Sequence, residues 1–221
     1  MKYSIAKFEE LVEQGYLRKS EKGDLVLYGY TDKTTFERHW NEYTTVARGL
    51  ILNRHTGHVV AKPFPKFFNL GETEETFAVN LPTDQYYEVF EKMDGSLGII
   101  FYYEGKWDVA TRGSFYSEQA EKAREMLKKY NFTNIPKHCT LLVEIIYPAN
   151  KIIVDYGKEE KLVLLGAYSS ADCTEYHLRS DVELMAMGQH GLRMEVAPKY
   201  DYTIEEMIQL QKTMPLSLIH I

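Results

Sequence analysis

The residue whose surroundings indicate chemistry most clearly is a lysine at the start of a tight turn. Lys92 stands in the stretch Glu91-Lys92-Met93-Asp94-Gly95-Ser96, between two apolar runs. An amine placed in this way can attack the α-phosphorus of a nucleoside triphosphate, release pyrophosphate and store the nucleotide as a phosphoramidate. Gly95 would let the backbone approach the nucleotide closely. A hairpin turn with an exposed lysine gives the same letters, so the turn alone leaves both interpretations open.

A second candidate is a carboxylate inside an apolar run. Glu144 interrupts the stretch Leu141–Ile146, where an unpaired charge would cost on the order of several kcal/mol. The carboxylate therefore needs a partner. A contact with a bound ligand and a structural salt bridge both satisfy that requirement.

Composition limits how such a site could hold a nucleic acid. The chain has 221 residues, 44% of them hydrophobic, and a formal net charge of -6. This length and composition suit a folded domain with a sizeable core. The charge has the wrong sign for binding nucleic acid through bulk electrostatics, so any phosphate contacts must come from locally placed cations.

Other classes of site have little support. Cys139 and Cys173 are too far apart for a thiolate metal pair, and the seven histidines lack paired helical spacing. We assign no metal ligands. The apolar runs are too short for a membrane helix, and the first residues have no secretion-signal pattern. We therefore predict a cytoplasmic protein with no membrane partner.

The elements that would position these residues follow from hydrophobic periodicity and turn residues. Short runs rich in β-branched and aromatic residues predict antiparallel strands, and one-sided apolar patterns predict helices. The predicted strands are Leu25–Tyr30, Thr45–Asn53, His58–Phe64, Tyr86–Lys92, Leu97–Tyr103, Trp107–Thr111, Thr140–Tyr147, Ile152–Tyr156 and Leu162–Tyr168. The predicted helices start after Ser4, after Ser117 and after Thr203, the last with a capping box to Glu206.

This pattern predicts an α+β fold in which antiparallel sheets dominate and helices flank them. No repeat or linker divides the chain, so we expect one domain over residues 1–215. The last residues, 216–221, end on an apolar run without a closing signal. We expect this tail to be non-native and the domain to be incomplete at its C-terminal end.

Several motifs together resemble one family. K-x-D-G at Lys92 is the signature of covalent nucleotidyltransferases. In their order and spacing, the further motifs are similar to the adenylyltransferase domain of phage-type, ATP-dependent RNA ligases of the tRNA-repair kind, the RNA ligase 1 family. The resemblance covers about Tyr28 to Ala167, and the motifs besides K-x-D-G are Val46–Leu52, Lys62–Leu70, Thr111–Ser114 and Leu142–Ile153.

The resemblance implies a fold and a set of site residues. The fold would be an antiparallel-sheet nucleotidyltransferase domain, an ATP-grasp-like ligase domain with flanking helices. Lys92 would be the adenylylated nucleophile, and we expect it to meet Arg48, Lys66 and Glu144 in one groove between two sheets. The implied nucleotide-binding residues are Tyr28, Arg48, Lys66, Glu91, Arg112 and Glu144.

The resemblance also implies ATP and Mg²⁺ as cofactors and RNA ends as substrate, with nicked tRNA one candidate, in RNA repair. A DNA ligase and a GTP-using capping enzyme are rivals of the same chemistry. A catalytically silent module that binds a nucleotide or an RNA end is the rival from another class. It gains support because a later Glu-Gly strand and a K-x-K strand of the superfamily are not found between Tyr168 and Ile221.

Overall fold

Two sheets packed face to face form the centre of the molecule. The computed structural model describes residues 1–81, 87–176 and 191–213. The first sheet has the strand order β1-β2-β3-β4 and the second the order β10-β9-β8-β6-β7. Every pairing in them is antiparallel except β10 with β9, which is parallel.

The bounds of the elements are as follows. The first sheet consists of β1 (Leu17–Lys22), β2 (Leu25–Tyr30), β3 (Arg48–Asn53) and β4 (Val59–Ala61). The second consists of β6 (Ser96–Tyr103), β7 (Lys106–Thr111), β8 (Cys139–Ile146), β9 (Lys161–Ser169) and β10 (Glu195–Val196). A separate antiparallel pair joins β5 (Val89–Phe90) to β11 (Lys199–Tyr200). The helices are α1 (Ile5–Glu13), α2 (Asp32–Phe36), α3 (Glu118–Leu127) and α5 (Ile204–Thr213), with short 3-10 turns at Glu74–Thr76, Ala78–Asn80 and Pro148–Asn150.

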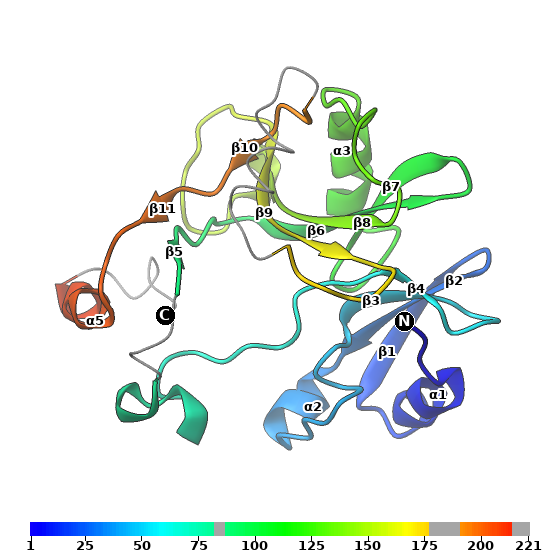
Figure 1. Ribbon diagram of the computed structural model, residues 1–221, viewed down its shortest axis with the longest axis horizontal. Coiled ribbons are helices and arrows are strands. Elements are labelled where there is room, and N and C mark those ends of the chain that lie inside the picture. The colour runs from blue at the N-terminus through cyan, green and yellow to red at the C-terminus, as the bar shows by residue number, and fades with distance from the viewer. Residues whose placement is uncertain (82–86, 177–190, 214–221) are drawn as a thin grey trace.

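Successive side chains of a strand point to opposite faces of its sheet, and apolar side chains on these faces form three layers. Between the sheets, Leu27 and Ile51 of the first meet residues such as Ile99 and Leu142 of the second. On the outer face of the first sheet, Phe8 of α1 stacks on Tyr28 with ring centroids 4.5 Å apart. Figure 1 shows the resulting order of layers, with α1 and α3 on opposite sides of the paired sheets.

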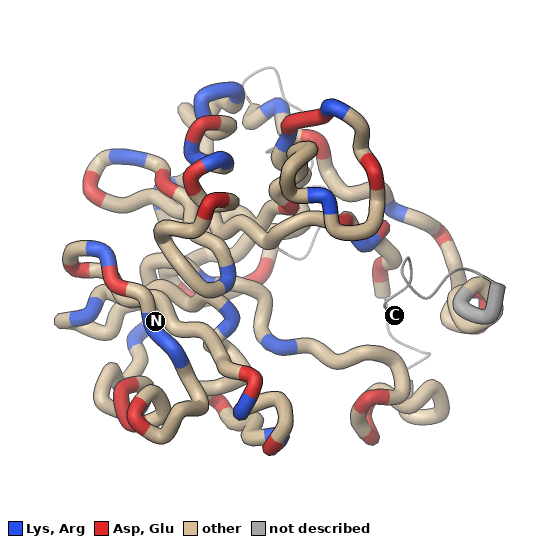
Figure 2. The backbone as a smooth tube through the Cα atoms, turned by 180° about the vertical axis from the view of Figure 1, so that it is seen from behind, with Lys and Arg blue, Asp and Glu red and all other residues tan. Residues whose placement is uncertain are grey.

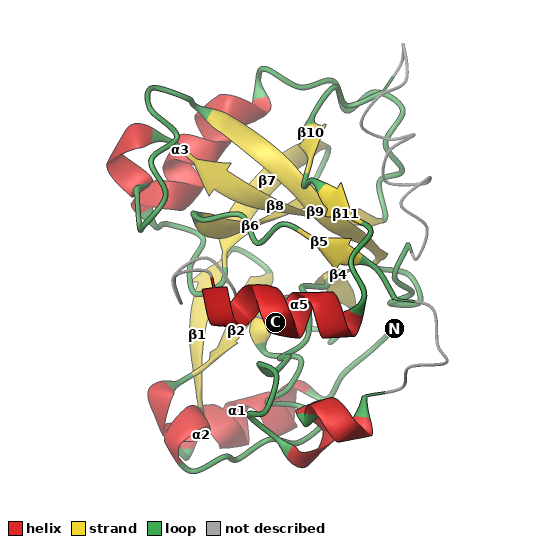
Figure 3. Ribbon diagram, turned by 90° about the vertical axis from the view of Figure 1, so that its left-hand side faces the viewer, coloured by secondary structure: helices red, strands yellow, loops and turns green. Residues whose placement is uncertain are grey.

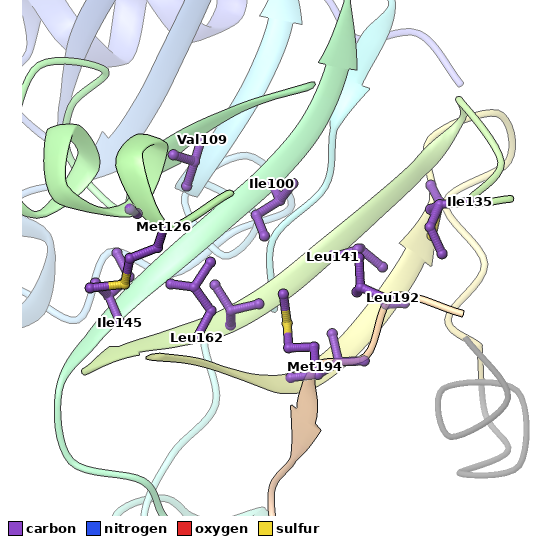
Figure 4. Packing of buried hydrophobic residues seen from close by; sticks show 14 of the residues in the cluster. Ile100, Val109, Met126, Ile135, Leu141, Ile145, Leu162, Leu192 and Met194 are labelled. Carbon is purple, nitrogen blue, oxygen red and sulfur yellow. The ribbon is translucent and has the colours of Figure 1, made fainter. Parts of the chain in front are cut away.

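The outer face of the second sheet is covered by α3. Met126 and Ala123 of the helix pack on Ile100, Val109 and their neighbours. Figure 4 shows the packing around Met126, Ile100 and Val109. The helix begins where the Ser117 Oγ accepts the Ala120 N–H at 3.2 Å, as its sequence predicts. Figure 3, viewed from the side of α5, shows this helix in front of the layered body.

Most predicted elements are present, with shorter bounds. The predicted capping box of the last helix is confirmed, because the Glu206 N–H donates to Thr203 Oγ1 at 3.2 Å and the Thr203 N–H donates to Glu206 Oε2 at 2.8 Å. Ser4 precedes α1 but accepts no capping hydrogen bond.

The strand predicted at 152–156 is wrong, since those residues form bends and loop. β1, β10, β11 and α2 were not predicted, and Tyr86, the first residue of the strand predicted at Tyr86–Lys92, lies outside the described residues. No helix in the described ranges is long and apolar enough to span a bilayer.

Candidate functional site

The turn that carries Lys92 joins β5 to β6 and is anchored by its own aspartate. Asp94 is buried, and its Oδ2 accepts the backbone N–H groups of Ile153 and Val154, each at 2.7 Å. The Asp94 backbone N–H donates to the Tyr156 hydroxyl at 3.1 Å. Lys92 itself is exposed. Asp94 therefore fixes the turn to the segment after β8 while the lysine amine stays accessible.

The next two residues hold the turn against the end of β8. A Cβ at Gly95 would lie 2.6 Å from the carbonyl oxygen of Ile145, so a larger residue could not fit without moving backbone. Ser96 Oγ donates to Asn150 Oδ1 at 3.1 Å, and Asn150 Nδ2 donates to the same Ile145 carbonyl at 2.9 Å. The close approach at Gly95 is thus to β8.

Glu144 of β8 lies next to this turn and faces the space between the sheets. It stands opposite Leu97 of β6 and shares the face of Leu142, which belongs to the core between the sheets. Its side chain is buried, with 9% of its residue surface exposed. No ion pair within 4 Å involves Glu144 in the described part of the chain, so the predicted alternative of a structural salt bridge does not account for it.

The charge of Glu144 is set by its neighbours. Burial raises the pKa of its carboxyl from 4.5 to about 7. The positive charge of Lys92, the Gly95 N–H and the positive charge of Arg48 all act to lower this pKa, while Asp94 acts to raise it. A group of charges from the turn and from the opposite sheet therefore acts on one buried carboxyl.

Arg48 supplies the cation from the opposite sheet. It stands at the start of β3, half-buried, with its guanidinium carbon 4.6 Å from the centroid of the Phe67 ring. Burial lowers the pKa of this guanidinium and proximity to Arg112 adds to the effect, whereas Tyr30 and Glu144 raise it. A guanidinium remains charged in proteins, so Arg48 carries a fixed positive charge towards Glu144.

Aromatic rings hold two further cations beside Arg48. Arg112 lies over Tyr30, with its guanidinium 5.2 Å from the ring centroid and Nη1 3.4 Å from the hydroxyl. Lys66 Nζ lies 4.0 Å from the centroid of Phe68 and 5.6 Å from that of Trp40. It also donates to the Phe67 carbonyl at 2.5 Å. Rings and cations of this kind attract each other through the ring quadrupole.

The structure brings some of the predicted residues together and leaves others apart. Lys92, Arg48 and Glu144 are electrostatically coupled, and Arg112 adjoins Arg48. Lys66 adjoins Phe67, the ring beneath Arg48, but its ammonium also lies 3.7 Å from the Glu72 carboxylate.

Two predicted nucleotide-binding residues have protein partners of their own. Tyr28 has no exposed surface, stacks on Phe8 and donates to Glu9 at 2.6 Å, because the middle of β2 is covered by α1. The interpretation of Tyr28 as a nucleotide contact is corrected accordingly. The Glu91 carboxylate accepts the Tyr200 hydroxyl at 2.9 Å, which ties β5 to the C-terminal segment.

Sequence reasoning missed three residues that shape the site. Tyr30 lies at the end of β2 beside Arg48 and Arg112, two positions after Tyr28. Asp94 was noted as part of the motif without its anchoring role, and Asn150 as part of a similar segment without its contacts to Ser96 and β8. Their contacts join segments far apart in the sequence, so no local pattern reveals them.

Comparison with solved structures identifies the class of fold. A provisionally named ATP-dependent DNA ligase from Aquifex aeolicus superposes with a TM-score of 0.56 and 14% sequence identity, covering 95% of this chain and 55% of that one. At this identity the similarity establishes the fold, which is the nucleotidyltransferase fold of ATP-dependent ligases.

The chain belongs to the RNA ligase family of the T4 RNA ligase 1 type, whose family model matches residues 46–212. A provisionally named RNA ligase of Thermovibrio ammonificans is 33% identical over 122 residues, covering 52% of this chain and 32% of that protein. A provisionally named bifunctional polynucleotide kinase/RNA ligase of Autographa californica nuclear polyhedrosis virus is 36% identical over 102 residues, covering 43% of this chain and 14% of that protein. The chain thus spans a third or less of the length of these two relatives.

Proposed function

We propose that this chain is the adenylyltransferase part of an ATP-dependent RNA ligase that works in RNA repair. The unprotonated Lys92 Nζ attacks the α-phosphorus of ATP and an N–P bond forms. The bond from the α-phosphorus to the oxygen that bridges to the β-phosphorus breaks, and pyrophosphate leaves. A 5′-phosphate RNA end then takes the AMP from Lys92, and a 3′-hydroxyl displaces AMP to form the phosphodiester. Nicked tRNA is a candidate substrate.

One observation carries this proposal. Lys92, on an anchored but accessible turn, acts on the same buried carboxyl as Arg48 from the opposite sheet. A lysine on an ordinary hairpin turn would have no buried carboxylate and arginine arranged around it. Membership of the RNA ligase family supports the same assignment.

The surrounding side chains suit a nucleoside triphosphate. Arg48 and Arg112 can donate paired N–H groups to phosphate oxygens, and Lys66 offers a point charge for the outer phosphates. Tyr30 holds Arg112 and adjoins Arg48, so it orients both guanidinium groups. Glu144 can accept a hydrogen bond from a ribose hydroxyl when it is ionised.

Mg²⁺ is the second proposed cofactor, and the residues present fit a metal held jointly with phosphates. The described ranges contain no group of three His, Cys, Asp or Glu residues that could enclose a metal. Mg²⁺ usually binds through one or two carboxylates, substrate phosphates and water. Glu144 would provide the carboxylate, and the ion would neutralise charge on the phosphates.

The decisive experiment is the intact mass of the chain after incubation with ATP and Mg²⁺. We expect an added AMP that peptide mapping assigns to Lys92, and no adduct with GTP. Lys92→Ala should remove the adduct, and Lys92→Arg should remove it equally because a guanidinium does not deprotonate to become a nucleophile. Lys2→Ala, at an exposed lysine on another part of the surface, is the matched control and should label normally.

The same experiment separates the rival interpretations. A GTP adduct would indicate a capping-type enzyme. ATP binding without any adduct would favour the catalytically silent module. An adduct that persists in Lys92→Ala would place the nucleophile at another residue and refute the assignment.

A further inference from the structure

A groove lies on the outer side of the second sheet, where β7 passes α3. It encloses about 380 Å³, and its walls include Lys22, Lys106, Trp107, Arg124, Lys128 and Phe132. β7 is an edge strand, and Lys106 begins it directly after the turn at Glu104 and Gly105, both of which have positive φ. None of these residues takes part in the site around Lys92.

Aromatic rings line one wall of the groove. Trp107 and Phe132 are half-buried, with ring centroids 4.9 Å apart and planes inclined at 30°. Tyr102 meets Trp107 edge-on at 5.4 Å, and Lys137 Nζ lies 5.1 Å from the Tyr102 centroid. Rings fixed in this way offer a face on which a planar base can stack, whatever the identity of the base.

The groove also carries positive charge that the protein does not neutralise. Lys22 and Arg124 share the buried carboxylate of Asp108, each at 2.7 Å, and Arg124 also pairs with Glu121 at 2.6 Å. Lys106 and Lys128 are exposed, and neither has a carboxylate within 4 Å in the described part of the chain. In a chain of net charge -6, such a local excess of cations beside aromatic rings is a specific feature.

We propose that this groove binds a single-stranded segment of the RNA substrate, with a base stacked on Trp107 or Phe132 and phosphates held by Lys106 and Lys128. The aromatic wall favours a nucleic-acid strand over an acidic peptide. The carboxylates of such a peptide would pair with the lysines but would not stack on the rings. The identity of the strand as RNA rests on the proposed function.

The course of β7 relates the groove to the site around Lys92. Its Lys106 end forms the groove, and its Thr111 end leads into Arg112. The two ends are five residue steps apart along the strand, which is roughly 17 Å at the usual rise. The groove therefore contacts the RNA strand some nucleotides away from the end that reacts, and it strengthens binding without touching the reacting atoms.

The test is direct binding of a fluorescent oligoribonucleotide of about 12 nucleotides, a length within the usual range of single-strand sites. It is measured without ATP at several salt concentrations. Lys106→Ala combined with Lys128→Ala should weaken binding about tenfold or more at low salt and should reduce the salt slope by roughly 1.4, the value for two lost phosphate contacts. Trp107→Leu should weaken binding about fivefold to a hundredfold, whereas Trp107→Phe should retain most of it. Lys2→Ala should bind as the wild type does.

Each result supports or overturns the inference. Unchanged affinity and slope in the double lysine variant, whose fold is checked by circular dichroism, would overturn it. Competition by polyglutamate as effective as competition by unlabelled RNA would also overturn it, in favour of an acidic protein partner. Lys92→Ala should bind RNA normally, so loss of the AMP adduct and loss of groove binding are separate outcomes. If the protein forms the AMP adduct at Lys92 but the groove variants bind RNA as the wild type does, only this inference is refuted.

Discussion

At the scale of single residues, Glu144 shows the strongest opposition between two effects on one pKa: burial raises it, and neighbouring positive charges lower it. Its carboxyl is surrounded by apolar strand residues, and the compensating charges of Lys92 and Arg48 come from elements that the sequence places far from β8. The apolar run around Glu144 sufficed to predict that the carboxylate needs partners. It could not identify them, because they depend on how the two sheets face each other.

The raised pKa of Glu144 predicts a specific pH dependence of stability. In the unfolded chain the carboxyl ionises around 4.5, whereas in the folded chain it ionises around 7. Below 4.5 it is protonated in both states, so it has no effect. As pH rises from 4.5 to 7 the unfolded chain ionises first, so the folded state loses stability, and above 7 the loss is complete. The full loss amounts to about 3 kcal/mol.

Glu144→Gln should remove this loss. Relative to the wild type, its free energy of unfolding should rise by up to about 3 kcal/mol between pH 5 and pH 8, as measured by urea denaturation at both pH values. Titrating groups that do not interact with Glu144 contribute equally to both proteins and cancel in the comparison. An identical pH dependence in the two proteins would contradict the burial argument.

At the scale of elements, the anchored turn explains both a success and a failure of sequence reasoning. The motif around Lys92 and the following strand were predicted where the structure has them. The apolar run at 152–156 was predicted as a strand, but its amides at Ile153 and Val154 donate to Asp94 instead of to a neighbouring strand. This contact joins residues about 60 positions apart, so local patterning could not reveal it.

The two tyrosines of β2 illustrate the same limit. Tyr28 and Tyr30 are two positions apart, and period-2 alternation assigns them to the same face. What distinguishes them is that α1 covers the middle of the strand through Phe8, while the end of the strand meets Arg112. Helix packing decides which tyrosine is free to contact a ligand, and the sequence alone does not specify it.

Two glycine substitutions test how the turn is seated on β8. Gly95→Ala would place its Cβ 2.6 Å from a backbone carbonyl, that of Ile145, which cannot move without distorting β8. We expect a loss of about 1–3 kcal/mol of stability and a weaker AMP adduct at Lys92. The measurements are urea denaturation and intact mass.

Gly113→Ala is the matched control for that experiment. Its Cβ would also lie 2.6 Å from a neighbour, but the neighbour is the exposed guanidinium of Arg18, which can swing away. We expect a change within about 0.5 kcal/mol. If both alanine variants lose the same stability, the closeness of β8 is not what requires a glycine at position 95.

At the scale of the whole molecule, charges of both signs are spread over the backbone, as Figure 2 shows. The acidic net charge was sufficient to predict that cations for RNA must be local. Family motifs predict Arg48, Arg112 and Lys66, which we propose bind the triphosphate. The RNA contacts proposed at Lys106 and Lys128 depend on the packing of α3 beside β7. Composition therefore limits the kind of site, and tertiary structure determines where it lies.

One buried carboxylate, through two ion pairs, joins three parts of the molecule. Asp108 of β7 receives Lys22 from the first sheet and Arg124 from α3, each at 2.7 Å. Burial on its own would raise the pKa of the Asp108 carboxyl, but the hydrogen bonds from Lys22 and Arg124 outweigh it and hold the pKa below its usual 3.8. The contribution to stability is therefore present above pH 3.8 and is lost as pH falls below that value.

Asp108→Ala should accordingly destabilise the protein by about 2 kcal/mol or more at pH 7, because it leaves two cations without their shared partner. The partners remain partly exposed, which places the expected loss at the lower end of the range for buried pairs. Asp24→Ala, at an exposed aspartate paired with His55, is the matched control and should change stability by less than about 0.5 kcal/mol. Urea denaturation at pH 7 and pH 3 measures both, and the difference between Asp108→Ala and the wild type should shrink at pH 3. Equal losses in the two variants at pH 7 would mean that the sheets and α3 are held together by apolar packing alone.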